Sequence, residues 1–343
     1  MRTQVSDVKV EGFERVVEVH NDSARLFGYI AIHNTKLGPG LGGIRFKEYG
    51  SNDEALTDVC GLARAMTNKN SLANINYGGG KAVIRKNAHY GLRYQQERVE
   101  LYKAMGEAVE QLRGSYIACE DVGTVTQDLY SVLETTKHCS GTQSDSGIAT
   151  AAGLFHVFET YCNWEEISFD DITVSLAGLG KVGWCLAENL YAAGVSLKAT
   201  DIVGSILDKF VAEHENTYRS YASIAHQEPC EVYSPCALGG IVNRVTRREL
   251  NCNAIIGSAN NQLDMKETDR FLHKRGVTYF PDYLVNAGGV IALAAELDEQ
   301  MENLSFYLEM MGDRTHAILS EAECSGRSML DVVEDIVAER LGK

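Results

Sequence analysis

The chain has 343 residues, of which 45% are hydrophobic, a composition and length typical of a globular protein with two domains of ordinary size. Its 32 basic and 47 acidic residues give a net charge of −15, which argues against binding to nucleic acid or to an anionic membrane. The N-terminus lacks the apolar core of a signal peptide, and no run of about 18 apolar residues predicts a transmembrane helix.

The first part of the chain alternates predicted strands and helices. Apolar and β-branched runs between turn residues predict strands over Arg15–His20, Leu26–Ile32, Ala82–Ile84 and Tyr116–Cys119. The glycine-rich segment Leu37–Gly43 is expected to form a loop. A capping box formed by Ser51 and Glu54 predicts a helix that runs to about Met66, and the spacing of apolar residues predicts an amphipathic helix over Tyr94–Leu112.

Two lysines in this part carry the strongest indication of chemistry. Lys81 directly follows Gly78–Gly80, which we expect to form a turn, and Lys69 should lie just beyond the C-terminus of the first helix. Glycines let a small substrate approach the backbone closely. A second ammonium group nearby can hold a carboxylate and lower the pKa of the first lysine, which can then act as a base. Taken alone, the segment is also typical of an ordinary surface turn.

The middle of the chain contains a βαβ unit. Residues Ile172–Ala177 form a buried type of strand, a helix continues to about Ala193, and a second strand, Val195–Thr200, ends at Asp201. The first strand runs into a Gly-x-Gly-x-x-Gly segment made of Gly178, Leu179, Gly180, Lys181, Val182 and Gly183. Later apolar runs predict strands over 231–234, 254–257 and 277–280, and a final amphipathic helix from Ser328.

The position of this glycine motif, between a strand and a helix, indicates a dinucleotide-binding site. The first glycine makes the tight turn, the second lets a pyrophosphate reach the helix N-terminus, and the third allows helix and strand to pack closely. Asp201 is placed to accept hydrogen bonds from ribose hydroxyls and would repel a 2′-phosphate, which favours NAD over NADP. The alternative is a packing turn in another kind of α/β protein.

The nine cysteines show no spacing typical of a metal site. Cys230 and Cys236 lie close together in the sequence, but no histidine at ligand spacing accompanies them. We therefore expect reduced, mostly buried thiols in a cytoplasmic protein, and no bound metal.

These elements predict an α/β fold with two domains and a cleft between them. We expect a substrate and oligomerisation domain made of residues 1–146 together with 325–343, onto which the last helix packs. Residues 147–324 are expected to form a doubly wound Rossmann domain that binds NAD. The substrate should lie near the carboxyl ends of the strands.

Over nearly its full length the chain resembles the Glu/Leu/Phe/Val amino acid dehydrogenase family, and in length and in Glu120–Thr124 it is most similar to the leucine-specific members. The matching segments are Ala31–Thr35 through Gly42–Gly43, Met66–Lys69, Gly78–Lys81, Glu120–Thr124, Gly178–Gly183, Pro235–Gly239, Gly257–Gln262 and Pro281–Gly289. The resemblance implies a homo-oligomer, either a dimer or an octamer.

The resemblance also implies roles for individual residues. Lys69 would bind the substrate carboxylate, Lys81 would be the general base that activates water, and Asp121 would pass a proton at the substrate nitrogen. The substrate pocket would be lined by Leu41, Gly42, Gly43, Cys119, Asn260, Val290 and Leu293, with Lys69 as anchor. Besides the glycine segment, the cofactor would contact Thr150, Asp201, Cys236, Ala237, Ala259, Asn260 and Asn286.

The implied reaction is the reversible oxidation of an apolar L-amino acid, with leucine, valine or isoleucine favoured, to the 2-oxo acid, ammonia and NADH. Apolar walls exclude a charged side chain, which would be buried without a partner. Leu293 is closer to the pattern of the phenylalanine enzymes, and one methylene is worth only about 1–3 kcal/mol in such a pocket. A dehydrogenase for phenylalanine or tryptophan is therefore the alternative.

Three positions depart from the family pattern, namely Ile44, Asn68 and the segment Ser144–Ala149. Ile44 replaces a threonine, Asn68 replaces tyrosine or leucine, and Ser144–Ala149 lacks the prolines that usually precede the threonine at position 150. Ile44 and Ser144–Ala149 are the only support for a third hypothesis, a nucleotide-binding protein that has lost catalysis. The three proposed catalytic positions are all retained.

Overall fold

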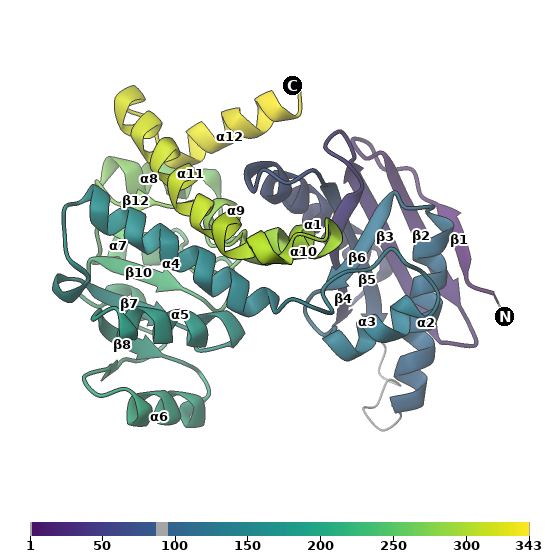
Figure 1. Cartoon of the computed structure of the whole chain (residues 1–343), viewed down its shortest axis with the longest axis horizontal. Helices are drawn as coiled ribbons and strands as arrows, with labels where there is room; N and C mark the ends of the chain where they lie inside the picture. The colour runs from purple at the N-terminus through teal and green to yellow at the C-terminus, as the bar shows by residue number, and fades with distance from the viewer. Residues whose placement is uncertain (1, 87–94, 343) are drawn as a thin grey trace. The chain divides into compact units, whose positions relative to one another are not determined.

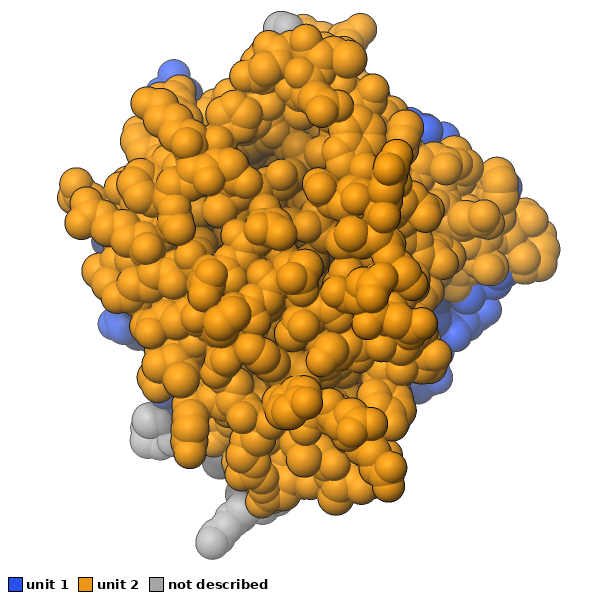
Figure 2. Space-filling view, turned by 90° about the vertical axis from the view of Figure 1, so that its left-hand side faces the viewer, with its two compact units in different colours: residues 1–145, 292–301 blue, residues 146–291, 302–343 orange. Residues whose placement is uncertain are grey.

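The computed structural model describes residues 2–86 and 95–342 and divides into two compact units (Figures 1 and 2). Unit 1 consists of Met1–Asp145 and Ala292–Met301. Unit 2 consists of Ser146–Ile291 and Glu302–Lys343. None of the helices within the described residues is long and apolar enough to cross a membrane.

Unit 1 contains a mixed sheet with the strand order β1-β2-β3-β5-β4-β6 (Figure 1). Its strands are β1 (Gln4–Asp7), β2 (Arg15–Asn21), β3 (Leu26–Asn34), β4 (Gly40–Glu48), β5 (Gly78–Lys86) and β6 (Tyr116–Glu120). The strands predicted over Arg15–His20 and Leu26–Ile32 are confirmed as β2 and β3, which pair in antiparallel orientation. Strand β4 runs parallel to both β5 and β6, so the carboxyl ends of these three strands point to the same edge of the sheet.

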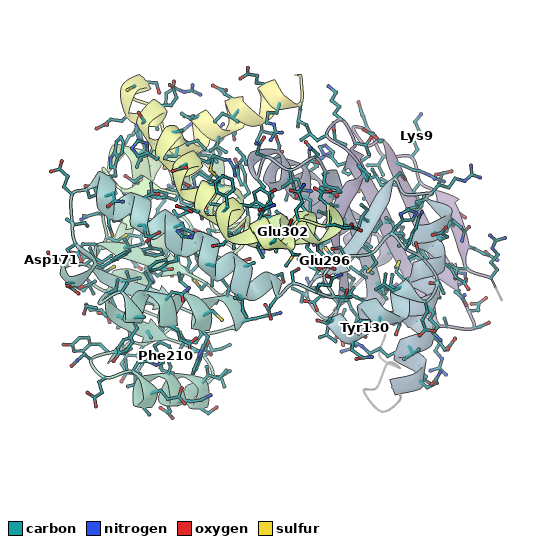
Figure 3. All side chains as sticks on the ribbon, viewed as in Figure 1. Lys9, Tyr130, Asp171, Phe210, Glu296 and Glu302 are labelled. Atoms are coloured by element: carbon teal, nitrogen blue, oxygen red, sulfur yellow. The ribbon has the colours of Figure 1, made fainter. Side chains whose placement is uncertain are left out.

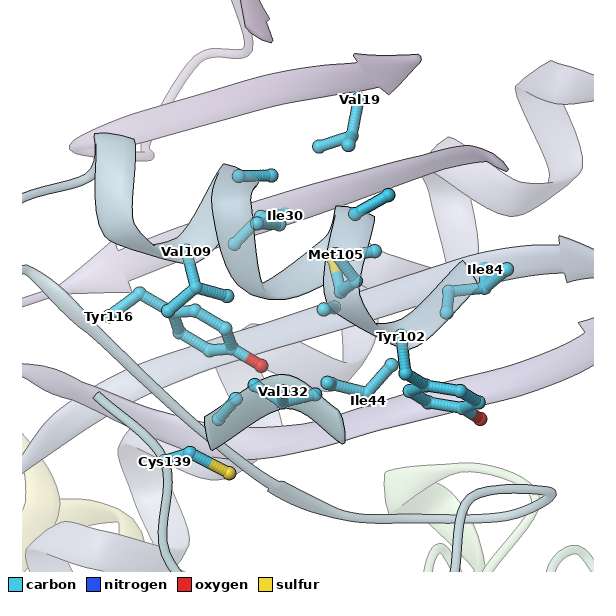
Figure 4. Close-up of a cluster of buried hydrophobic side chains, with 14 of the residues drawn as sticks. Val19, Ile30, Ile44, Ile84, Tyr102, Met105, Val109, Tyr116, Val132 and Cys139 are labelled. Carbon is cyan, nitrogen blue, oxygen red and sulfur yellow. The ribbon is translucent and has the colours of Figure 1, made fainter. Parts of the chain in front are cut away.

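Helices cover both faces of this sheet. They are α1 (Asn52–Leu72), α2 (Gln95–Gln111) and α3 (Thr126–Leu133). Ala31 and Val83 pack in the cluster that includes α1, whereas Ile30 and Ile84 pack on the opposite face in the cluster that includes α2 and α3 (Figure 4). Because strand side chains alternate between faces, β3 and β5 need apolar residues at nearly every position. Tyr94, the predicted start of α2, lies outside the described residues.

The predicted loop over Leu37–Gly43 is confirmed only to Pro39, because Gly40 already begins β4, and the predicted turn at Gly78–Gly80 is wrong, because Gly78 begins β5. The glycines are required by close packing within the sheet. A Cβ atom on Gly79 would lie 2.0 Å from Oγ1 of Thr67 on α1, and one on Gly78 would lie 2.0 Å from the carbonyl oxygen of Asn34. At these positions glycine allows strand and helix backbones to approach closely.

Helix α1 also continues past its predicted end at Met66 and ends at Leu72, so Lys69 lies in its last turn rather than beyond it. The extension depends on Asn70, which is fully buried although asparagine is a poor helix former. Its Nδ2 donates to the carbonyl oxygen of Gly78 at 2.6 Å. This long-range contact, which sequence periodicity does not contain, holds the last turn against β5.

Unit 2 contains a parallel sheet with the order β12-β11-β10-β7-β8-β9. Its strands are β7 (Thr173–Ala177), β8 (Ser196–Thr200), β9 (Tyr218–Arg219), β10 (Val232–Pro235), β11 (Ala254–Ile255) and β12 (Thr278–Tyr279). Numbered along the unit, the order is 3-2-1-4-5-6 from one edge, that of a Rossmann fold. The predicted fold class is confirmed.

The first helix of unit 2, α4 (Ser146–Trp164), precedes β7 in the chain, and the other helices come after β7. These are α5 (Lys181–Ala192), α6 (Gly204–Glu213), α7 (Thr246–Glu249), α8 (Lys266–Lys274), α9 (Asp282–Val285), α11 (Leu304–Ser325) and α12 (Met329–Arg340). Helix α10 (Gly288–Leu297) begins in unit 2 and ends in unit 1. Three short 3₁₀ segments occupy Phe169–Asp171, Ala225–Gln227 and Met301–Asn303.

The division of the chain differs from the predicted one at its C-terminal end. Residues 325–343, expected to pack on the first domain, belong to unit 2, whereas 292–301 belong to unit 1. Polar and apolar contacts hold the C-terminal segment in unit 2. Ser328 Oγ donates to Oδ2 of Asp269 on α8 at 2.6 Å, and α12 contacts β12. The amphipathic pattern predicted the helix but not the partner of its apolar face.

Candidate active site

Lys81 and Asp121 form the centre of a polar site in unit 1. The Nζ atom of Lys81 lies 2.9 Å from Oδ1 of Asp121, and the two side chains are 6% and 17% exposed. Lys81 lies within β5, Asp121 follows the last residue of β6, and β4 runs between these strands. The fold therefore brings two predicted site residues from separate strands into one buried ion pair.

Gly43 on β4 makes this contact possible. It lies opposite Cys119 in the β4–β6 ladder, two residues before Asp121. A Cβ atom on Gly43 would lie 2.3 Å from the carbonyl oxygen of Glu120 and 2.6 Å from Cβ of Asp121. Because real Cβ atoms do not approach this closely, only glycine leaves space for the Asp121 side chain beside β4.

Arg45, which the sequence analysis does not identify, completes the polar site. Its Nε donates to Oδ2 of Asp121 at 2.6 Å, and its Nη1 lies 3.3 Å from Oδ2 of Asp58 on α1. The hydroxyl of Tyr49 donates to the same Asp58 oxygen at 2.7 Å. The alternation of side chains on β4 could have indicated Arg45, because it lies two residues after Gly43.

The two cations determine the charge of Asp121. Burial raises the pKa of this carboxyl group, but Lys81 and Arg45 together outweigh burial and lower the pKa to about 2. Burial lowers the pKa of Arg45, and the Asp121 carboxylate more than compensates, so this pKa is raised. The carboxylate of Asp121 therefore lies between two basic side chains, with each oxygen in contact with a different one.

Lys69 lies on α1, which packs against β5, and Gly42 lies on β4 next to Gly43. Lys69 is in the last turn of α1, directly before Asn70, whose side chain reaches the start of β5. Val83 of β5 packs in the cluster that includes α1, and Lys81 precedes it by two residues, so Lys81 is on the α1 side of the sheet. Gly42 has no space for a side chain, because its Cβ atom would lie 1.9 Å from the carbonyl oxygen of Gly80.

Three of the predicted pocket residues, Leu41, Cys119 and Leu293, lie in one buried apolar cluster of unit 1. The cluster also contains Tyr77, which the sequence analysis does not identify and whose hydroxyl donates to Oδ1 of Asp298 at 2.7 Å. Burial raises the pKa of the Cys119 thiol to about 12, so this side chain is a neutral wall. The fourth predicted wall residue, Val290, is buried in the part of α10 that belongs to unit 2.

Glu296, one turn after Leu293 on α10, fixes the segment 141–144 (Figure 3). Its Oε1 accepts hydrogen bonds from the backbone N–H groups of Gly141 at 3.0 Å and Thr142 at 3.1 Å. Its Oε2 accepts from those of Gln143 and Ser144, both at 3.2 Å. Burial raises the pKa of Glu296, but these four donors lower it overall. A carboxylate thus orders the chain directly before the segment in which the family prolines are missing.

In unit 2 the glycine fingerprint connects β7 to α5. Gly178 has a φ of +110°, and a Cβ atom on it would lie 2.7 Å from Cβ of Ala237. A Cβ atom on Gly183 would lie 1.9 Å from the carbonyl oxygen of Gly178 and 3.1 Å from Cβ of Cys236, whereas one on Gly180 would meet nothing within 4 Å. The first and third glycines are therefore required by packing. The second leaves open the N-terminus of α5, where a pyrophosphate fits.

The carboxylate of Asp201 lies beside this turn. Its Oδ2 accepts from the backbone N–H of Leu179 and its Oδ1 from that of Val203, both at 2.7 Å. Ile202, which follows Asp201, is 88% exposed, and Leu238, which follows Ala237, is 75% exposed. No sequence motif marks these two exposed apolar side chains, which lie next to predicted cofactor contacts along the chain.

A second polar group of unit 2 surrounds Asn286. Its Nδ2 donates to Oδ1 of Asn260 and to the carbonyl oxygen of Ser258, both at 3.1 Å. Its Oδ1 is buried and makes no hydrogen bond within the described residues, so an acceptor is available for a donor on a ligand. Thr150 on α4 lies beside the following glycines, because a Cβ atom on Gly289 would lie 3.0 Å from its Oγ1.

Ala259, another predicted cofactor contact, is buried in the loop that carries Asn260. The side chain of Gln262 holds this loop, because its Nε2 donates to the carbonyl oxygens of Gly257 at 2.6 Å and Ala259 at 3.1 Å. The fingerprint, Asp201 and the buried amide acceptor of Asn286 together match the pyrophosphate, the ribose and the carboxamide of a nicotinamide dinucleotide. The residues present therefore fit such a cofactor.

Comparison with known proteins gives consistent matches along the chain. The model of the Glu/Leu/Phe/Val dehydrogenase dimerisation domain matches residues 11–138, and that of Glutamate/Leucine/Phenylalanine/Valine dehydrogenase matches residues 196–329. A phenylalanine dehydrogenase of Thermoactinomyces intermedius is 35% identical over 97% of this chain and 92% of its own length. A leucine dehydrogenase of the same organism is 35% identical over 83% of this chain and 78% of its own. A crystal structure of L-tryptophan dehydrogenase from Nostoc punctiforme matches with a TM-score of 0.81 and 30% identity over 96% of both chains.

Proposed function

The chain belongs to the Glu/Leu/Phe/Val dehydrogenase family, and we propose that it catalyses the NAD-dependent oxidative deamination of an apolar L-amino acid. It is an amino acid dehydrogenase, an oxidoreductase that acts on a CH–NH₂ group and uses a nicotinamide cofactor. In the proposed reversible reaction, the amino acid, water and NAD⁺ give the 2-oxo acid, ammonium, NADH and a proton. The observation that carries the proposal is the contact of buried Lys81 with Asp121, whose other carboxylate oxygen binds Arg45.

The roles of the site residues follow from this chemistry. A bound nicotinamide would supply the hydride acceptor for the oxidation at Cα of the amino acid, which gives an imine. Lys69 holds the substrate carboxylate, and Lys81 in its neutral form takes a proton from the water that adds to the imine carbon. Asp121, in contact with Lys81, passes a proton to the nitrogen so that ammonia can leave. Gly42 and Gly43 keep the backbone beside the reacting atoms free of side chains.

The preference for NAD rests on Asp201. Its carboxylate is held in place by two backbone N–H groups beside the fingerprint. A fixed negative charge there can accept hydrogen bonds from the ribose hydroxyls and repels a 2′-phosphate. Asn260, Asn286 and Thr150 would orient the carboxamide, with Cys236, Ala237 and Ala259 as the adjacent surface.

The apolar cluster around Leu41, Cys119 and Leu293 supports a substrate with an uncharged, apolar side chain. We propose that leucine, valine or isoleucine is favoured, because Leu41 matches the pattern of the leucine enzymes. An aromatic substrate is the second candidate, supported by Leu293 and by relatives named phenylalanine and tryptophan dehydrogenase. The match to a dimerisation domain supports a homo-oligomer, a dimer or an octamer.

The test is NADH formation at 340 nm with the purified protein, NAD⁺ and a panel of apolar, aromatic and acidic L-amino acids at alkaline pH. We expect turnover of apolar substrates with release of ammonia, and no turnover of glutamate. Faster turnover of phenylalanine or tryptophan than of leucine would establish the second candidate. A folded protein that binds NAD⁺ and oxidises none of the amino acids would refute the proposal.

A further inference from the structure

Arg45 binds the same carboxylate as Lys81, yet the proposed reaction gives it no role. Lys81 lies 2.9 Å from Oδ1 of Asp121, and Arg45 Nε lies 2.6 Å from Oδ2. The side chains of Arg45 and Asp121 are both 17% exposed, so solvent screens these charges only partly. The carboxylate is therefore shared between two cations and does not form a simple one-to-one pair with Lys81.

This sharing matters because a lysine acts as a base only after it loses its proton. A single carboxylate 2.9 Å from the ammonium group of Lys81 stabilises the charged form and so opposes proton loss. A guanidinium group keeps its positive charge at every physiological pH. Placed on the second oxygen of Asp121, it offsets the field of the carboxylate at Lys81.

We infer that Arg45 is a positioning residue that offsets the charge of Asp121, so that Lys81 can release its proton in the working pH range. The inference rests on the proposed role of Lys81 as the base. Asp58 and Tyr49 hold Arg45 from the opposite side: Asp58 Oδ2 lies 3.3 Å from Arg45 Nη1 and accepts a hydrogen bond from the Tyr49 hydroxyl at 2.7 Å. The guanidinium orientation is thus fixed by α1 and β4 together.

Other charged or titratable groups lie on the elements of unit 1 around Lys81, Asp121 and Arg45. They are Asp58 and Lys69 on α1, Tyr49 after β4, Glu120, Cys119 and Tyr116 on β6, and Glu296 on α10. Glu120 accepts a hydrogen bond from the hydroxyl of Thr126, and burial raises the pKa values of Cys119, Tyr49 and Tyr116. All these groups stay in place when only Arg45 is changed. A shift of the pH profile in such a variant therefore reports on Arg45.

The experiment measures kcat/KM for the best apolar amino acid between about pH 6 and pH 11 in Arg45→Gln, Arg45→Lys and the unchanged protein. Loss of the positive charge leaves the field of the Asp121 carboxylate at Lys81 without an opposing charge, so the ascending limb of the pH profile should move about one pH unit to higher pH in Arg45→Gln. Activity at neutral pH should fall about tenfold and recover at high pH. Arg45→Lys, which keeps the charge, should return the limb close to its original position.

Arg98→Gln is the control, because Arg98 pairs with a different carboxylate of the same unit, that of Asp128, through two hydrogen bonds of 2.6 Å. The ascending limb of the pH profile of Arg98→Gln should not move. Two results would overturn the inference. One is an unshifted ascending limb of the pH profile in folded Arg45→Gln. The other is a loss of kcat/KM that is equal at every pH and that Arg45→Lys does not restore. If Arg45→Gln does not fold, Arg45→Lys decides: a limb moved by a full unit despite the retained charge contradicts the inference. Absence of any amino acid oxidation by the unchanged protein would instead refute the proposed function.

Discussion

Gly43→Ala should disable the site while leaving the fold largely intact. The new Cβ atom would lie 2.3 Å from the carbonyl oxygen of Glu120 and 2.6 Å from Cβ of Asp121. Non-bonded atoms are at their optimal separation at about 3.5–4.0 Å, so one or both groups must move by about 1 Å or more. A displacement of about 1 Å at a reacting group can cost about 10²-fold in rate. We therefore expect kcat to fall by about two orders of magnitude.

The stability of the same variant separates displacement from unfolding. Overpacking at a buried position typically costs about 1–3 kcal/mol, which urea unfolding measures directly. Gly61→Ala is the matched control, because Gly61 lies on the exposed side of α1 and its added Cβ atom would meet nothing within 4 Å. That substitution should raise stability by about 1 kcal/mol and leave kcat unchanged. NAD affinity, a property of unit 2, should be unaffected in both variants. A folded Gly43→Ala protein with normal kcat would refute the reasoning.

Three further outcomes follow from the charges and hydrogen bonds described above. Asp201→Ala should raise KM for NAD⁺ and make NADP⁺ a usable cofactor, because the repulsive carboxylate is gone; unchanged ratios of kcat/KM for the two cofactors would contradict this. Glu296→Gln should cost about 1–3 kcal/mol in urea unfolding and raise KM for the amino acid more than it lowers kcat, since four N–H groups lose a charged acceptor beside Leu293. Asp121 has a folded-state pKa of about 2, below its unfolded value. Its contribution to the free energy of unfolding is therefore present above about pH 4 and lost as the pH falls towards 2. Asp121→Asn should therefore lose less stability than the unchanged protein between pH 4 and pH 2, by roughly 2 kcal/mol, and equal losses would contradict the assignment.

The sequence predicts the parts of the fold that depend on local patterns. The βαβ unit and its glycine fingerprint are visible because strand, turn and helix each leave a signal within a few residues. The glycines of β4 and β5 were assigned to a loop and a turn, because glycine is typical of both. Their actual requirement, contact with Thr67, Asn34 and Glu120, comes from distant parts of the chain.

The same limit applies to the site. Lys81 and Asp121 were identified by their motifs, whereas Arg45 has no motif of its own. Its spacing of two residues from Gly43 indicates a shared face only once these residues are known to form the strand β4, which pairs with β6. The role of Glu296 could not be predicted from local sequence either, because its four backbone partners lie more than 150 positions earlier in the chain. The C-terminal helix was predicted correctly as a helix, but its amphipathic pattern does not specify which unit covers its apolar face.

The measurement that tests the central claim most directly is the rate of NADH formation by Lys81→Ala with the best substrate, in samples whose NAD⁺ affinity and fold are measured in parallel. Loss of a general base typically costs about 10²–10⁴-fold. We predict a loss in kcat of this size with unchanged NAD⁺ binding. A folded Lys81→Ala protein that retains the original rate would contradict the claim that the buried lysine of unit 1 is the base of the reaction.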